Sequence, residues 1–336
     1  MSSSPKGPGP KPSNLEIPPY TAKNRRPEHK ENQASEAKKV ALVFPGQGSQ
    51  FVGMGQELCK RSSKAREVFE EADDALRFPL SRLCFEGPEE KLKETANAQP
   101  AIMTASWALY RAALENGEWG GRDPDFVAGH SLGEYTALVA SCAMDFYHAV
   151  QIVRERGRLM QEAAQRRPGG MAAILGLEDD TVEEVCWTTG SEIANVNAPG
   201  QIVISGDRLA LAQAMDLCHA QGARRVIPLE VSGPFHSSLM RPALEGMFRA
   251  LGQVTFRDPL VPLVANAKAQ IIDSAQDVKD ALLWQLCNCV QWRRSVDVMI
   301  QQGVNTFVET GPGRVLTGLI RRIDPEVKAY SLGDLR

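Results

Sequence analysis

A serine lies between two glycines in Phe126–Tyr135, where a short apolar run is followed by Gly-x-Ser-x-Gly. Gly129, Ser131 and Gly133 fit a tight strand-to-helix turn that presents a serine hydroxyl at the start of a helix. The apolar run favours a strand, and the residues from Glu134 to Ser141 favour the helix. Backbone N–H groups at a helix start can stabilise an oxyanion. We therefore predict that Ser131 is a nucleophile.

A serine nucleophile needs a general base, and the chain has five histidines. His236 lies in a loop after the predicted strand 225–231, and loops at strand ends often present catalytic groups. His130 is the neighbour of Ser131, so its side chain should leave the turn in a different direction. The other three fall in the N-terminal segment or on helical patterns. We predict that His236 takes the Ser131 proton; the alternative is a structural loop histidine.

Composition limits the classes of function. The 336 residues are 43% hydrophobic and 24% charged, as in soluble globular proteins of one large or two modest domains. The absence of an apolar run of about 18 residues argues against a membrane span. A net charge of −3 without a basic helix argues against nucleic acid as a ligand. We expect a monomer.

The seven cysteines are scattered and odd in number, which favours free thiols in a reducing compartment. Cys287 and Cys289 could form a metal or redox pair, but no second Cys/His cluster completes a zinc site. We therefore predict no metal site.

Residues 1–38 are rich in proline and lysine and lack an apolar face, which predicts a disordered tail. The acidic residues Glu16, Glu28 and Glu31 make it a poor transit peptide by composition. The long extension nevertheless suggests a eukaryotic organelle enzyme, so we predict the mitochondrial matrix, with the cytoplasm as the alternative.

The remaining pattern predicts an α/β fold. A strand at Lys39–Phe44 runs into a glycine-rich turn at 45–50, which lacks the Gly-Lys-Ser/Thr of a phosphate loop. Residues 167–231 show the order β-α-β-β-α-β, which is the ferredoxin-like arrangement. We predict an α/β-hydrolase-like body with a parallel sheet, formed by 39–166 and 232–336, into which 167–231 is inserted as a small subdomain. Its other predicted helices cover 53–59, 65–76, 88–95, 99–116, 145–166, 234–251, 277–287 and 315–323, and its other strands cover 261–265 and 306–309.

Six motifs occur in a fixed order: Phe44-Pro-Gly-Gln-Gly-Ser-Gln50, Gly129-His-Ser-Leu-Gly-Glu134, Met160-Gln-Glu-Ala163, Asn195-Val-Asn-Ala-Pro-Gly-Gln-Ile-Val-Ile-Ser-Gly206, Pro234-Phe-His236 and Glu309-Thr-Gly-Pro-Gly313. Together they resemble the malonyl-CoA:acyl carrier protein transacylases and the related acyltransferase domains of fatty acid and polyketide synthases. The resemblance covers roughly residues 39–335. It implies ping-pong transfer of malonyl from coenzyme A to a carrier protein thiol through a malonyl-serine ester.

The resemblance also implies roles for particular residues. His236 matches the family's base, and the backbone N–H groups of Gln47 and Leu132 match its oxyanion hole. A backbone carbonyl near Gln291 would orient the imidazole in place of a triad carboxylate. The chain departs from the family there, because Cys289 occupies the position of a usual proline.

Malonyl selectivity requires a cation for the free carboxylate, and a guanidinium suits it. In the helix predicted over 145–166, Arg156 falls beside the apolar stripe, whereas Arg154 and Arg158 project towards solvent. The family's carboxylate-binding arginine also maps to Arg156; the alternative is a structural arginine at the subdomain junction.

Four further residues are predicted to line the cleft on the basis of the resemblance: His130, Asn195, Asn197 and Phe235. A bulky residue at 235 is similar to malonyl-selective members, because it leaves little room for a 2-methyl branch. The two asparagines could equally be turn residues.

We therefore expect transfer of malonyl to acyl carrier protein for fatty acid synthesis, with no cofactor beyond the coenzyme A of the substrate. The rivals are an acyltransferase serving a polyketide synthase, a serine hydrolase or thioesterase, and a silent carrier-protein-binding scaffold. Arg156 argues against the hydrolase, since a neutral ester does not need its charge.

Overall fold

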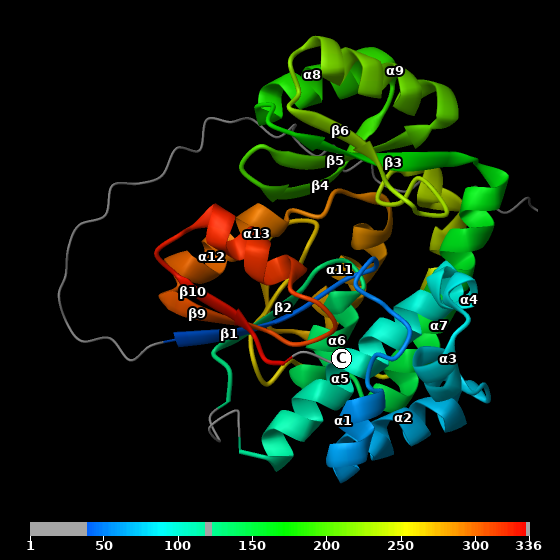
Figure 1. Ribbon diagram of the computed structural model, residues 1–336, viewed down its shortest axis with the longest axis vertical. Coiled ribbons are helices and arrows are strands. Elements are labelled where there is room, and N and C mark those ends of the chain that lie inside the picture. The colour runs from blue at the N-terminus through cyan, green and yellow to red at the C-terminus, as the bar shows by residue number, and fades with distance from the viewer. Residues whose placement is uncertain (1–38, 118–122, 334–336) are drawn as a thin grey trace, which may run out of the picture. The chain divides into compact units, whose positions relative to one another are not determined.

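The computed structural model describes residues 39–117 and 123–333, and the predicted tail at 1–38 lies outside them. The described part contains two β-sheets with helices packed on them (Figure 1). No helix among these residues is long and apolar enough to cross a bilayer.

The first sheet is the predicted parallel sheet. Its strands are β1 (Lys39–Phe44), β2 (Phe126–Gly129), β7 (Leu263–Val264), β8 (Ile271–Ile272), β9 (Val304–Glu309) and β10 (Lys328–Ser331). They lie in the order β10-β9-β1-β2-β7-β8, and every neighbouring pair is parallel except β7 and β8. The topology places β1 and β2 side by side at the centre, so the loops that follow them lie at the same edge.

Both faces of this sheet are covered. Along β1, Leu42 and Phe44 pack into the core that includes α5 (Thr95–Glu115), α6 (Gly133–Ala140) and α7 (Phe146–Arg166). Ala41 and Val43 face the opposite core, which includes α12 (Trp292–Gln301) and α13 (Val315–Ile323). Alternate residues of a strand point to opposite faces, and burial of both faces explains why residues 40–44 of this strand are all apolar.

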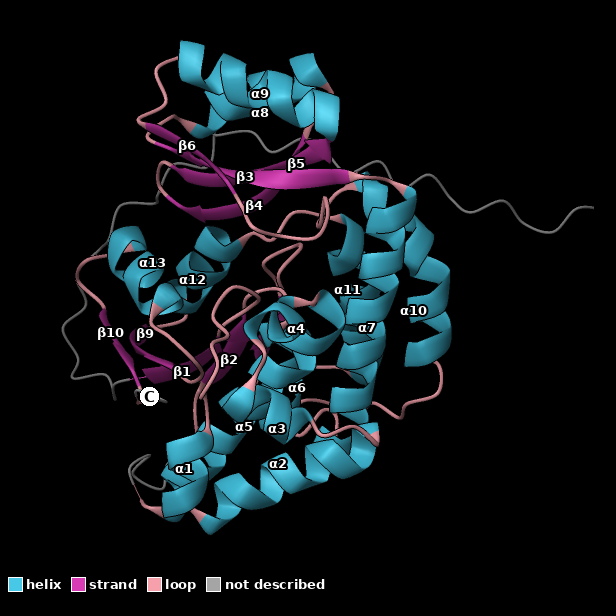
Figure 2. Ribbon diagram, turned by 45° about the vertical axis from the view of Figure 1, so that its right-hand side comes forward, coloured by secondary structure: helices cyan, strands magenta, loops and turns pink. Residues whose placement is uncertain are grey.

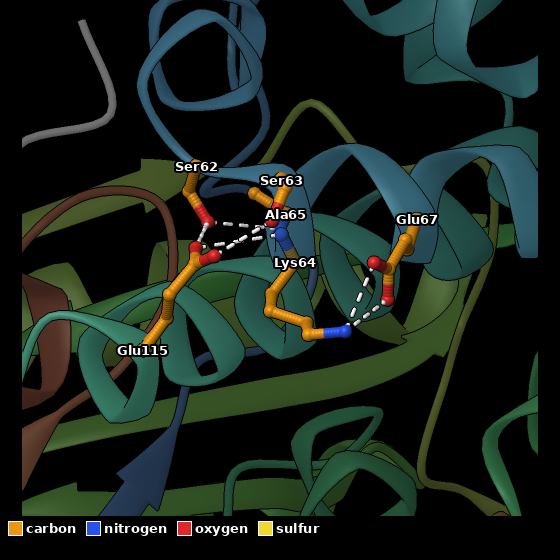
Figure 3. Close-up of polar contacts among 6 residues, drawn as sticks. All are labelled: Ser62, Ser63, Lys64, Ala65, Glu67 and Glu115. Carbon is orange, nitrogen blue, oxygen red and sulfur yellow. Dashed lines mark hydrogen bonds and ion pairs between the residues drawn. The ribbon is translucent and has the colours of Figure 1, made fainter.

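The other helices of this body are α1 (Gln56–Arg61), α2 (Ser63–Leu76), α3 (Leu80–Glu86), α4 (Glu89–Lys93), α10 (Leu244–Leu251) and α11 (Ala275–Cys287) (Figure 2). The C-terminal end of α5 is tied to the N-terminus of α2 by Glu115 (Figure 3). Its carboxylate accepts hydrogen bonds from the hydroxyls of Ser62 (2.5 Å) and Ser63 (2.6 Å), while Ser62 Oγ caps α2 by accepting from the N–H of Ala65 (3.0 Å). An anion is favourable at a helix N-terminus, so this cluster fixes α2 against α5.

The second sheet is antiparallel. Its elements are β3 (Gly169–Leu175), α8 (Asp179–Thr189), β4 (Glu192–Ala198), β5 (Gln201–Asp207), α9 (Arg208–Ala220) and β6 (Arg225–Pro228). The strand order β4-β5-β3-β6, with all pairs antiparallel, confirms the ferredoxin-like arrangement. Val290, in the loop before α12, exchanges backbone hydrogen bonds with β4 and connects the two sheets.

One predicted helix is wrong in its first part. Residues 234–237 form a loop, followed by the 3₁₀ helix η1 (Ser238–Ala243) and then by α10. Pro234 and Pro242 have no N–H to donate to a helix, and His236 has a left-handed backbone with φ 56°. Four elements were not predicted from the sequence: α3, α12, β8 and β10.

All seven cysteines are free thiols.

Candidate active site

Ser131 lies at the turn between β2 and α6, in the left-handed region with φ 52°. The flanking glycines are required by close backbone approach. A Cβ on Gly129 would come within 1.9 Å of the Gly133 carbonyl carbon, and a Cβ on Gly133 within 2.1 Å of the Phe44 carbonyl oxygen. The motif therefore lets the turn pack against the end of β1 while it holds the serine in a conformation that non-glycine residues rarely adopt.

The loop before η1 brings His236 to the serine, and Ser131 Oγ lies 2.7 Å from His236 Nε2. On the other side of the ring, Nδ1 lies 3.0 Å from the backbone carbonyl oxygen of Gln285. A carbonyl only accepts hydrogen bonds, so Nδ1 carries the proton and Nε2 is left to accept from the serine hydroxyl. Burial, with the charge of Arg156 as a second cause, lowers the pKa of His236 to about 3. The imidazole is therefore neutral at physiological pH, as a general base must be.

The orienting carbonyl is a correction to the sequence analysis, which assigned this position to Gln291. Gln291 lies directly before α12, and its carbonyl accepts the N–H of Ser295 at 2.9 Å in the first turn of that helix. Gln285 lies in the last turn of α11, where carbonyls lack intrahelical donors. Its carbonyl, which among the described residues otherwise accepts only a long bond from the N–H of Asn288 (3.4 Å), is the one that accepts from His236.

Arg156 points from α7 into the site and is only 1% exposed. Its Nη1 donates to Gln99 Oε1 (2.6 Å), and its Nη2 donates to Gln285 Oε1 (2.8 Å) and Ser131 Oγ (3.2 Å). Its buried Nε has no acceptor within hydrogen-bond distance among the described residues, and its guanidinium lies 5.5 Å from the centre of the Tyr135 ring. Burial lowers the pKa of this guanidinium. A buried cation beside the nucleophile, held by neutral amides, is set up to receive an anion.

The neighbouring Arg154 and Arg158 differ in how far their side chains are exposed. Arg158 is exposed, as predicted, and pairs with Glu155 and Glu162. Arg154 does not project fully into solvent: it is half-buried, and its guanidinium lies 4.2 Å from the centre of the Phe78 ring.

The two predicted oxyanion amides belong to segments that contact each other. Gly46, next to Gln47, packs against the strand-to-helix turn at residues 129–133, which we call the elbow. A Cβ on Gly46 would lie 2.6 Å from the carbonyl oxygen of His130. At the start of α6, the N–H groups of Gly133 and Glu134 donate to the backbone. Within the part of the chain that the structure describes, the N–H of Leu132 and that of Gln47 have no acceptor. Both amides are thus free to bind an oxyanion.

The predicted cleft-lining residues separate into two groups. His130 leaves the elbow towards the second sheet, where its Nε2 lies 2.8 Å from Asn197 Oδ1, and Asn195 is buried next to Val290. Both asparagines belong to β4 and are not turn residues. Phe235 is 4% exposed and packs in the main hydrophobic core.

Sequence analysis missed three polar residues of the site: Gln99, Asn266 and Gln285. Gln99 and Gln285 are fully buried on helices, and Asn266 follows β7 and accepts the N–H of Ser131 at 2.6 Å. A glutamine among apolar residues, such as Gln285 between Leu282 and Leu286, is a signal for a buried polar partner. The identity of that partner, Arg156, depends on a contact between distant elements and has no local signal.

Comparison with known proteins gives concordant matches. Residues 41–330 match the family model described as "Acyl transferase domain". The "Malonyl CoA-acyl carrier protein transacylase" of Bacillus subtilis is 45% identical over 301 residues, covering 88% of this chain and 94% of the relative. The protein of the same name from Escherichia coli is 44% identical over 298 residues, covering 88% and 96%.

Solved structures similar to this chain lead to the same family. An acyl carrier protein S-malonyltransferase from Vibrio cholerae superposes with a TM-score of 0.84 at 40% identity, covering 88% of this chain and 97% of that one. A malonyl-transacylase in complex with a type II polyketide synthase acyl-carrier protein gives a TM-score of 0.85 at 41% identity, with 88% and 96% covered.

Proposed function

The chain belongs to the acyl transferase domain family, and we propose that it transfers the malonyl group of malonyl-CoA to the phosphopantetheine thiol of an acyl carrier protein. Its relatives carry this activity in their names. The distances around Ser131 support a two-step transfer.

In the first step, Ser131 Oγ attacks the thioester carbonyl carbon while His236 Nε2 accepts the hydroxyl proton. The amides of Gln47 and Leu132 stabilise the oxyanion of the tetrahedral intermediate. The C–S bond then breaks, and the proton on Nε2 passes to the departing thiolate of coenzyme A. In the second step, His236 Nε2 takes the proton of the carrier protein thiol, whose sulfur attacks the carbonyl carbon of the malonyl-serine ester. The bond between that carbon and Ser131 Oγ breaks, and the proton on Nε2 passes to Oγ and restores the serine hydroxyl.

The observation that carries the assignment of a dicarboxylic acyl group is Arg156. Its guanidinium is buried, donates to the neutral oxygens of Gln99 and Gln285, and lies 3.2 Å from the Ser131 hydroxyl. A charge in that place has no use for a neutral ester, which argues against a general serine hydrolase. For the distal carboxylate of a malonyl group it provides charge-assisted hydrogen bonds.

Intact-mass spectrometry after incubation with malonyl-CoA tests the proposal. The unaltered protein should gain one malonyl group, and Ser131→Ala should gain none. Addition of phosphopantetheinylated acyl carrier protein should then move the mass increment to the carrier. An adduct on Ser131→Ala, or an adduct that only water removes, would reject the transferase assignment.

The same assay addresses the pathway. We propose that the protein serves fatty acid synthesis, so a fatty acid carrier protein should discharge the malonyl enzyme at least as fast as a polyketide carrier protein. The opposite order would favour the polyketide alternative, for which one structural neighbour is bound to such a carrier.

The mitochondrial location is part of the proposal and depends on residues 1–38, which lie outside the described part. A fluorescent fusion of the full chain should enter mitochondria, whereas a fusion starting at residue 39 should stay in the cytoplasm. Equal distribution of the two fusions would refute a targeting role for the tail.

A further inference from the structure

A buried carboxylate lies behind the nucleophile. Glu134 is on the first turn of α6, three residues after Ser131, and is 1% exposed. Its Oε2 accepts two hydrogen bonds, from the side-chain Nε2 of Gln285 (2.8 Å) and from the backbone N–H of Asn266 (3.0 Å). Burial raises the pKa of this carboxyl to about 7. Burial of a carboxylate costs free energy unless hydrogen bonds compensate for the lost water.

The bond to Gln285 decides which way that amide faces. Its Nε2 donates both to Glu134 and to the carbonyl of Ser131 (2.9 Å), so its Oε1 is turned towards Arg156 Nη2 (2.8 Å). A flipped amide would place an NH₂ group against the guanidinium, donor against donor. An ionised carboxylate has no hydrogen to donate and only accepts, and this acceptor therefore selects the orientation of Gln285 that holds Arg156.

The bond to Asn266 holds the elbow. With its backbone N–H on Glu134, Asn266 accepts the N–H of Ser131 (2.6 Å) and donates Nδ2 to the carbonyl of Gly129 (2.6 Å). Both sides of the strained turn are thereby tied to one side chain. The network connects α6, α11 and the loop after β7 through a single carboxylate oxygen.

We propose that Glu134 is a positioning residue for acyl selection: by accepting from Gln285 it fixes the guanidinium of Arg156 for the substrate carboxylate, and by accepting from Asn266 it fixes the serine turn. This inference rests on the proposed function, because it concerns how the same site distinguishes malonyl from acetyl groups. It predicts that the preference for malonyl depends more on the reach of the acceptor at 134, meaning the length of the side chain that carries it, than on the charge of that acceptor.

Three variants separate reach from charge. Glu134→Gln has the reach and an amide oxygen but no charge; Glu134→Asp has the charge but is shorter by one C–C bond, roughly 1.5 Å; Glu134→Ala has neither. The measurement is the ratio of kcat/KM for serine acylation by malonyl-CoA to that by acetyl-CoA. A loss of folded protein lowers both values equally and leaves this ratio unchanged.

We expect the ratio to fall about tenfold or more in Glu134→Asp and Glu134→Ala, since a hydrogen bond that orients a charged group is lost, and to stay within about threefold of the unaltered protein in Glu134→Gln. Gln285→Ala should lower the ratio similarly, and adding Glu134→Ala to it should lower it little further, because the two residues act in series. An unchanged ratio in Glu134→Asp, or a fall in Glu134→Gln as large as in Glu134→Ala, overturns the inference. Absence of any malonyl adduct on the unaltered protein would instead be a failure of the proposed function.

Discussion

Replacement of Arg156 by alanine gives the sharpest test of the site. The guanidinium is a buried cation beside the nucleophile, so it can discriminate a dicarboxylic from a monocarboxylic acyl group by attraction of the distal carboxylate. In the free protein its bonds go to the neutral oxygens of Gln99, Gln285 and Ser131. A malonyl carboxylate that takes the place of one of these neutral acceptors gains a charge-assisted hydrogen bond and the attraction of a poorly hydrated charge.

The magnitude follows from that geometry. A hydrogen bond to a charged group contributes about 1.5–3 kcal/mol, and one or two such bonds to a carboxylate give about 2–5 kcal/mol. At about 1.4 kcal/mol per factor of ten, Arg156→Ala should lower kcat/KM for malonyl-CoA by about 30- to 4,000-fold. Acetyl-CoA has no distal carboxylate, so its kcat/KM should change by less than about tenfold, and the preference for malonyl should largely disappear.

The assay is rapid-quench acylation of Ser131 with each thioester, read by intact mass. Arg158→Ala is the matched control, because it removes a cation two residues away on the same helix. That side chain is exposed and paired with Glu155 and Glu162, and surface pairs contribute little, so both rates should stay within about twofold. If Arg156→Ala slows both thioesters equally, Arg156 supports the fold of the site and does not select the acyl group.

Three other outcomes are expected. His236→Ala should slow acylation by about 10²–10⁴ in a single-turnover measurement, as for loss of a general base; a change below threefold would remove it from the mechanism. Burial and the nearby guanidinium lower the pKa of His236 to about 3, so the imidazole stays neutral until the pH falls towards that value. The acid limb of the pH–rate profile that vanishes in His236→Ala should therefore lie below pH 6.5, and a limb at or above pH 6.5 contradicts the lowered pKa. Gly133→Ala places a Cβ 2.1 Å from the Phe44 carbonyl oxygen and should reduce the free energy of unfolding by about 1–3 kcal/mol or more. The matched Gly318→Ala on α13, where a Cβ meets nothing within 4 Å, should raise the free energy of unfolding by about 0.5–1 kcal/mol. Chemical denaturation measures both, and equal effects of the two variants would refute the steric explanation of Gly133.

The parts of the fold that local pattern determines were predicted correctly. β1 and α13 have the predicted bounds, and the elbow follows its predicted strand. β8 and β10 were missed because strands of two and four residues exist only through pairing with a neighbour, and a single sequence does not show that partner.

The site shows the same division. Ser131, His236 and Arg156 carry local signals (a glycine motif, a loop after a strand, a helical face), and the structure brings them together. The orienting carbonyl was placed wrongly at Gln291 because backbone carbonyls are alike in sequence and only helix ends decide which are free. Once α12 is known to begin at Trp292, the Gln291 carbonyl is engaged in its first turn, and the carbonyls that can accept a further bond are those at the end of α11.

The use of a neutral carbonyl at His236 follows from the need to bind an anion. In a serine site with a carboxylate at this place, the negative charge would favour the protonated imidazole and would also attract the adjacent guanidinium. Gln285 instead offers two neutral oxygens, its carbonyl to His236 Nδ1 and its Oε1 to Arg156. The imidazole stays neutral and ready to accept a proton, and the charge of Arg156 remains available. The carboxylate of Glu134 accepts from Nε2 of the same amide, whose Oε1 accepts from Arg156, so it orients the glutamine and leaves the hydrogen bonds of the guanidinium to neutral oxygens.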